Sequence, residues 1–143
     1  MGGRTSRELF LIALGRAARD KLEKTVHQLE KAQSRLNAEE NAIAWSQVAL
    51  QASLVLDKNA ATYWRRTFDA PLSIEGYQWR VRTALRVGDW PLVARSIDAM
   101  PPELQKDPAW LYWRGRAHAV AGHADDAKHH YTQLAGQHHF YGL

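Results

Sequence analysis

Two similar strings decide the predicted fold: WRVR at Trp79–Arg82 and WRGR at Trp113–Arg116. The spacing between their tryptophans also separates Trp45 from Trp79, and Gly88 from Gly122. A period of about 34 residues with a glycine turn between two helices is typical of tetratricopeptide-like repeats. Such repeats bury their apolar faces only by stacking on their neighbours, which produces an α-solenoid.

The residues around these strings predict helix along the whole chain. Good helix formers dominate, and no segment shows the two-residue alternation of a strand. Start signals divide the helices: Asn37 with Glu40 forms a capping box, Asp57 is a candidate cap, and Pro91 fits a first helical turn. The expected helices cover about 6–18, 21–36, 38–56, 58–68, 73–88, 89–100, 107–122 and 124–135, with a first turn of another at 138–143.

We therefore predict an all-α protein, a right-handed superhelix of about four antiparallel helix pairs that forms a single domain over residues 1–143. The tetratricopeptide consensus itself is matched poorly, so the shared feature is the period. We expect the large aromatic side chains to fill the space between successive helix pairs.

The composition excludes several function classes. The chain of 143 residues has no cysteine, which excludes a disulfide scaffold, a thiolate metal site and a cysteine nucleophile. The net charge of +4 lies within residues 1–37, where acidic side chains are interspersed, so we predict no nucleic-acid binding. The longest apolar run, Leu9–Leu14, is too short to span a bilayer, and no signal peptide is visible.

From about residue 9 onward, the sequence resembles the superhelical region of the soluble lytic murein transglycosylases. The family's opening A-x-x-R-A-A-R-x-D is similar to Ala13–Asp20, and its W-R-x-R-A-A-L-R-x-x-D-W is similar to Trp79–Trp90, with Thr83 in place of an alanine. The motifs that follow in the same order are M-P at Met100–Pro101, W-x-Y-W-x-x-R-A at Trp110–Ala117, and the Y-x-x-L-A and F-Y-G-x-L-A pair at Tyr131–Ala135 and Phe140–Leu143.

This resemblance implies a periplasmic bacterial enzyme that cleaves peptidoglycan glycan strands and forms a 1,6-anhydro product. In the family, one glutamate of a lysozyme-like domain C-terminal to the superhelix acts as acid and base, within a Glu-Ser motif. The chain contains no Glu-Ser pair. We therefore expect a non-catalytic fragment whose partners are murein strands and its own C-terminal catalytic domain, with no cofactor and no lytic activity of its own. The signal peptide would precede the chain.

The candidate ligand-contacting residues belong to the repeated strings or adjoin them. Tryptophan can stack on a pyranose ring, and arginine can bind a carboxylate through two hydrogen bonds. The candidates are Arg80, Arg82, Trp110, Arg114 and Arg116. The alternative, which the repetition favours, is that these residues pack between helices, with arginine stems on tryptophan rings. The histidines near the C-terminus, at 129, 130, 138 and 139, are spaced as exposed helix positions, so no metal site is predicted.

A second functional class remains open. A tetratricopeptide-like superhelix can be a free-standing adaptor that binds a protein or peptide in its groove. The coding sequence after residue 143 distinguishes the two readings, because a lysozyme-like domain with a Glu-Ser motif would follow only in the transglycosylase. An independent hydrolase would need two carboxylates in one pocket, and no spacing in the chain suggests such a pair.

Overall fold

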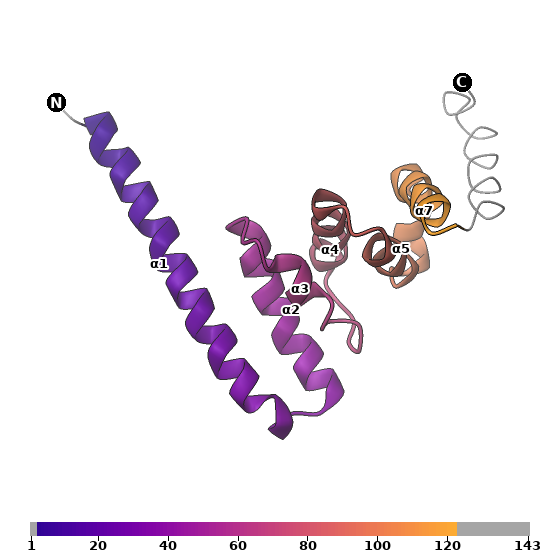
Figure 1. Cartoon of the computed structure of the whole chain (residues 1–143), viewed down its shortest axis with the longest axis horizontal. Helices are drawn as coiled ribbons and strands as arrows, with labels where there is room; N and C mark the ends of the chain where they lie inside the picture. The colour runs from indigo at the N-terminus through magenta and orange to yellow at the C-terminus, as the bar shows by residue number, and fades with distance from the viewer. Residues whose placement is uncertain (1–2, 123–143) are drawn as a thin grey trace. The chain divides into compact units, whose positions relative to one another are not determined.

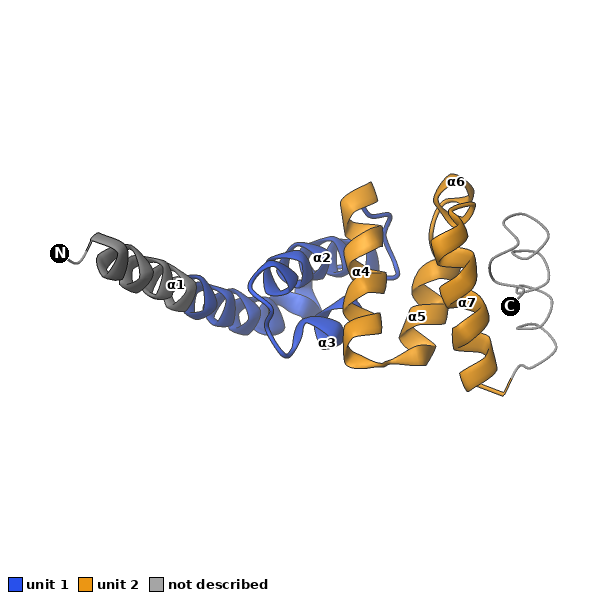
Figure 2. Ribbon diagram, turned by 90° about the horizontal axis from the view of Figure 1, so that it is seen from above, with its two compact units in different colours: residues 1–72 blue, residues 73–143 orange. Residues whose placement is uncertain are grey.

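The computed structural model describes the backbone of residues 3–122 and the side chains of residues 18–122. Every regular element in this part of the chain is a helix, which confirms the all-α prediction. The chain divides into two compact units, residues 1–72 and 73–143 (Figure 2). A single superhelix over residues 1–143 stays a prediction, as do the helices at 124–135 and 138–143, which lie outside the described residues.

The first unit begins with one long helix, α1 (Gly3–Ala32), followed by a 3-10 turn, η1 (Gln33–Arg35). The predicted break between helices at 6–18 and 21–36 was therefore wrong. Neither Arg19 nor Asp20 is a helix breaker, because each keeps its backbone N–H and tolerates helical dihedral angles. After η1 the chain turns back, and α2 (Ala38–Leu54) runs beside α1 (Figure 1).

The start of α2 has the predicted capping box. The amide of Glu40 donates to Oδ1 of Asn37 at 2.8 Å, and the amide of Asn37 donates to Oε1 of Glu40 at 2.9 Å. A third helix, α3 (Ala60–Trp64), is shorter than the predicted 58–68. Asp57 does not cap it, because its Oδ1 accepts from the amide of Asn59 in a turn that precedes the helix.

The core of the first unit joins all three of its α-helices. Its members are apolar side chains at most 9% exposed, so hydrophobic burial holds α1 and α3 against α2. These core residues are Leu22, Leu29, Trp45, Val48, Ala52 and Ala60.

The second unit contains α4 (Ile74–Val87), α5 (Trp90–Asp98), α6 (Pro102–Gln105) and α7 (Pro108–Val120). The predicted boundaries at residue 73 and between residues 88 and 89 are confirmed, since each carries a cap. The hydroxyl of Ser73 accepts from the amide of Gly76, Gly88 ends α4 with φ of +71°, and Asp89 accepts from the amide of Leu92. The short α6 was not predicted.

In the described part of the second unit, helix α5 lies between α4 and α7 and contacts both (Figure 2). Its buried side chains Leu92, Val93 and Ile97 are at most 4% exposed. No helix in the described part of the chain is both long and apolar enough to cross a membrane.

Candidate functional site

The five candidate residues lie on α4 and α7 of the second unit, and two of them belong to its interior. Arg80 is 1% exposed and Trp110 is 8% exposed. Burial lowers the pKa of Arg80 to about 10; the neighbouring Tyr77 acts in the opposite direction, and Arg95 lowers the pKa further. Arg80 therefore keeps its charge at neutral pH. Its burial makes a packing role the better account of this arginine.

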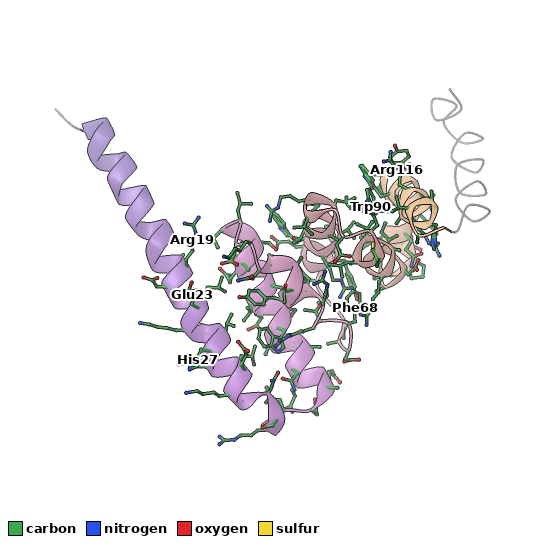
Figure 3. All side chains as sticks on the ribbon, viewed as in Figure 1. Arg19, Glu23, His27, Phe68, Trp90 and Arg116 are labelled. Carbon is green, nitrogen blue, oxygen red and sulfur yellow. The ribbon has the colours of Figure 1, made fainter. Side chains whose placement is uncertain are left out.

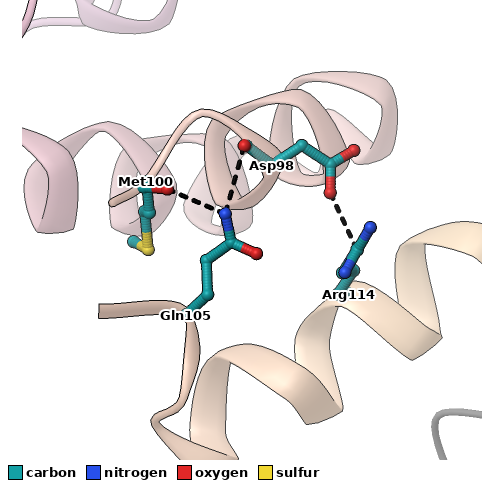
Figure 4. Close-up of polar contacts among 4 residues, drawn as sticks. All are labelled: Asp98, Met100, Gln105 and Arg114. Carbon is teal, nitrogen blue, oxygen red and sulfur yellow. Dashed lines mark hydrogen bonds and ion pairs between the residues drawn. The ribbon is translucent and has the colours of Figure 1, made fainter. Parts of the chain in front are cut away.

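A third candidate, Arg114, is engaged by an acidic neighbour. Its Nε lies 2.7 Å from Oδ1 of Asp98, the last residue of α5 (Figure 4). The backbone next to this ion pair is fixed by Gln105, whose Nε2 donates to the carbonyls of Asp98 at 3.2 Å and Met100 at 2.7 Å. Together these contacts join both α7 and α6 to the end of α5, so Arg114 serves the fold of the second unit.

The other two candidates, Arg82 and Arg116, are exposed, and each guanidinium lies over a tryptophan ring. The Cζ atom of Arg82 is 5.8 Å from the ring centroid of Trp79, which belongs to the same helix. The Cζ atom of Arg116 is also 5.8 Å from a ring centroid, but that ring is Trp90 at the start of α5 (Figure 3). Arginine and tryptophan attract each other in this arrangement because the ring face is electron-rich.

Arg116 is part of an aromatic group that we call the α5–α7 aromatic cluster, consisting of Trp90, Tyr112, Trp113 and Arg116. The rings of Trp90 and Trp113 stack with centroids 6.3 Å apart and planes at 30°. Tyr112 meets Trp113 edge-on at 5.1 Å, and Nη1 of Arg116 lies 3.4 Å from the Tyr112 hydroxyl. All three aromatic side chains are half-buried, so each still presents surface to solvent.

Sequence reasoning proposed Arg116 as a site residue but not Trp90 or Tyr112. Tyr112 precedes Arg116 by four residues, and this spacing, which places both side chains on one helix face, was an available signal. Trp90 gave no such signal, because it meets Arg116 only through the packing of α5 on α7.

The repeat spacing places one tryptophan on each of α2, α4 and α7, but in different environments. Trp45 is 2% exposed, stacks on Tyr63 at 5.8 Å and lies 4.3 Å from the guanidinium of Arg66. Trp79 and Trp113 are half-buried. Burial raises the pKa of Tyr63, and the carboxylate of Asp57 adds to this effect, so that phenol stays protonated.

The first unit has a groove of about 880 Å³ between α1 and α2. Leucine, valine and alanine side chains form its apolar part, while its exposed polar residues are Lys21, Thr25, Gln28, Gln47 and Gln51. Among residues 18–122 no group of three or more His, Asp or Glu side chains could hold a metal ion. The C-terminal histidines lie outside the described residues.

We compared the sequence with known protein families and with curated proteins. No protein-family model matches the chain, and no curated protein matches it either.

Proposed function

We propose that this chain is a non-catalytic scaffold of a peptidoglycan lytic transglycosylase, and that it holds a murein glycan strand for a separate catalytic domain in the periplasm. The observation that carries the proposal is the α5–α7 aromatic cluster, in which half-buried tryptophans adjoin an exposed arginine. The ordered motifs that resemble the family support the same assignment, as does the all-helical fold.

The chemistry of the cluster suits a sugar. The flat apolar face of an indole can cover the C–H face of a pyranose ring, and this contact removes apolar surface from water. A guanidinium next to the indole can donate hydrogen bonds to hydroxyl, acetamido or carboxylate oxygens of the same residue. The stacked Trp90 and Trp113 support each other, so little side-chain entropy would be lost on binding.

Binding without cleavage is the expected activity, because a glycosidic acid needs a carboxyl group whose pKa is raised in an apolar pocket. Glu103, the last glutamate of the sequence, has no such environment. Its Oε1 lies 3.2 Å from Nζ of Lys106, and its side chain is 84% exposed. We expect no anhydro product when this chain is incubated with purified murein.

The proposal is tested by co-sedimentation of the 143-residue chain with purified sacculi at low salt. We expect the chain to sediment with the sacculi and the Trp90→Ala variant to remain largely in solution. Trp79→Ala is the matched control, since it removes a half-buried, arginine-covered tryptophan outside the cluster. Absence of sedimentation by the unaltered chain would refute the proposal, and equal losses in both variants would refute the role of the cluster.

A free-standing adaptor that binds a peptide is the second candidate function, and the groove between α1 and α2 favours it. An apolar groove between antiparallel helices can accept an amphipathic helix through residues spaced three and four apart. The gene decides between the two: a lysozyme-like domain with a Glu-Ser motif encoded after residue 143 supports the scaffold, while a stop codon there supports the adaptor.

A further inference from the structure

We propose that the α5–α7 aromatic cluster selects acidic sugars, that is, pyranose rings that bear a carboxylate, over neutral sugars of the same size. This inference rests on the proposed glycan-binding function and specifies the chemistry of its site. It assigns the ring contact to Trp90 and Trp113 and the charge contact to Arg116.

The first argument is the charge of Arg116. Its contacts within the described part of the chain are the Trp90 ring at 5.8 Å and the Tyr112 hydroxyl at 3.4 Å, and neither is anionic. Arg114, two residues earlier, is neutralised by Asp98 at 2.7 Å. The two arginines of this string therefore differ. Among residues 18–122, Arg114 has a carboxylate partner and Arg116 has none. An exposed guanidinium in this position can bind a ligand carboxylate.

The second argument is the geometry of the rings. A sugar inserted between two rings needs contacts of about 3.5–4 Å on each face, hence a separation of about 7–8 Å. The centroids of Trp90 and Trp113 are only 6.3 Å apart, so a pyranose cannot enter between them. The ligand must therefore lie on the exposed surface of the cluster, to which the exposed Arg116 and the half-buried Tyr112 also contribute. A sugar ring with one carboxylate on its edge can contact the indoles with its face and Arg116 with its carboxylate.

An acidic peptide is a less suitable ligand for the cluster. A peptide gains affinity from a sheet edge or from an extended groove. The apolar groove between α1 and α2 belongs to the first unit, whereas the cluster belongs to the second unit.

The test compares two tetrasaccharides that differ only in their acidic groups: chitotetraose, which is neutral, and a peptide-free strand of alternating N-acetylglucosamine and N-acetylmuramic acid. Binding to the full chain is followed by NMR shift titration of tryptophan indole N–H signals. An exposed charge pair contributes modestly, so we expect the acidic strand to bind about two- to fivefold more tightly at low salt. The preference should decrease with added salt, because exposed charges are screened.

Three variants locate the preference. Arg116→Gln should abolish it, so that both tetrasaccharides bind as the neutral one does to the unaltered chain. Arg116→Lys keeps the charge and should retain part of the preference. Arg82→Gln is the matched control, because Arg82 occupies the corresponding position of the other string, is exposed and also covers a tryptophan, yet lies outside the cluster. We expect this variant to keep the full preference.

The outcomes separate this inference from the proposed function. If both tetrasaccharides bind the unaltered chain equally, selection of acidic sugars is refuted while glycan binding stands. If neither binds, both proposals fail. An equal loss of preference in Arg82→Gln would refute the assignment to Arg116. A strand that bears peptide stems distinguishes the carboxylate of the sugar from that of the stem: tighter binding of the peptide-free strand supports the inference. Tighter binding of an isolated acidic peptide at the cluster would overturn it.

Discussion

Ser53→Ala should destabilise the first unit through one buried hydrogen bond. The indole Nε1 of Trp64, on α3, donates to Oγ of Ser53, on α2, at 2.9 Å, and Oγ donates to the carbonyl of Ala49 at 2.8 Å. Ser53 is 0% exposed and Trp64 is 1% exposed. Alanine therefore leaves the indole N–H without an acceptor and with no water in its place.

The magnitude follows from this burial. Removing one partner of a buried hydrogen bond costs about 1–3 kcal/mol, because the remaining group has lost its hydration. The change in volume is a single oxygen atom, so a cavity adds little. The free energy of unfolding of a small domain is about 5–15 kcal/mol, so the loss is easily measured. The assay is urea denaturation of both proteins, followed by far-UV circular dichroism.

Ser46→Ala is the matched control for this experiment. Its hydroxyl also donates to a carbonyl of α2, that of Ile43 at 2.6 Å, but accepts no bond from a buried indole. We expect this variant to change the free energy of unfolding by less than about 0.5 kcal/mol. In a double-mutant cycle, Ser53→Ala should cost little in a Trp64→Phe background, since phenylalanine has no N–H. Equal costs of Ser53→Ala in both backgrounds would refute the reasoning.

The remaining predictions concern helix ends and one ion pair. Asn37→Ala removes the capping oxygen of α2 and should lower the free energy of unfolding by about 1 kcal/mol, measured by urea denaturation. Gly88→Ala should lower the free energy of unfolding by about 1–2 kcal/mol, because φ of +71° strains a residue that has a Cβ. The added Cβ meets no atom within 4 Å, so no clash contributes, and a gain in melting temperature would contradict this prediction. Arg114→Gln breaks the pair with Asp98, whose side chain is 44% exposed, and should cost at most about 1 kcal/mol, less at high salt; a cost unchanged in 1 M salt would contradict the charge contribution.

Local signals predicted helix ends well and the first helix poorly. Ser73, Gly88 and Asp89 act on the backbone within four residues, so the ends that they form do not depend on distant packing. At Arg19-Asp20 the predicted break had no breaker residue behind it, because arginine is a good helix former and one aspartate is tolerated within a helix. The predicted helix at 58–68 was reduced to α3, five residues long, because Asp57 forms a turn with Asn59 before the helix instead of capping it.

By itself, the amino-acid sequence determined that this protein is helical, where most helices begin, and that one tryptophan recurs at a constant spacing on α2, α4 and α7. Those properties depend on propensity, capping and periodicity, which act over one or two turns. Only the tertiary structure decided which arginine is buried, which is paired and which stays exposed. Arg80, Arg114 and Arg116 lie in near-identical strings, and their roles differ because α5 presents a different neighbour to each of the two on α7, Asp98 to Arg114 and Trp90 to Arg116.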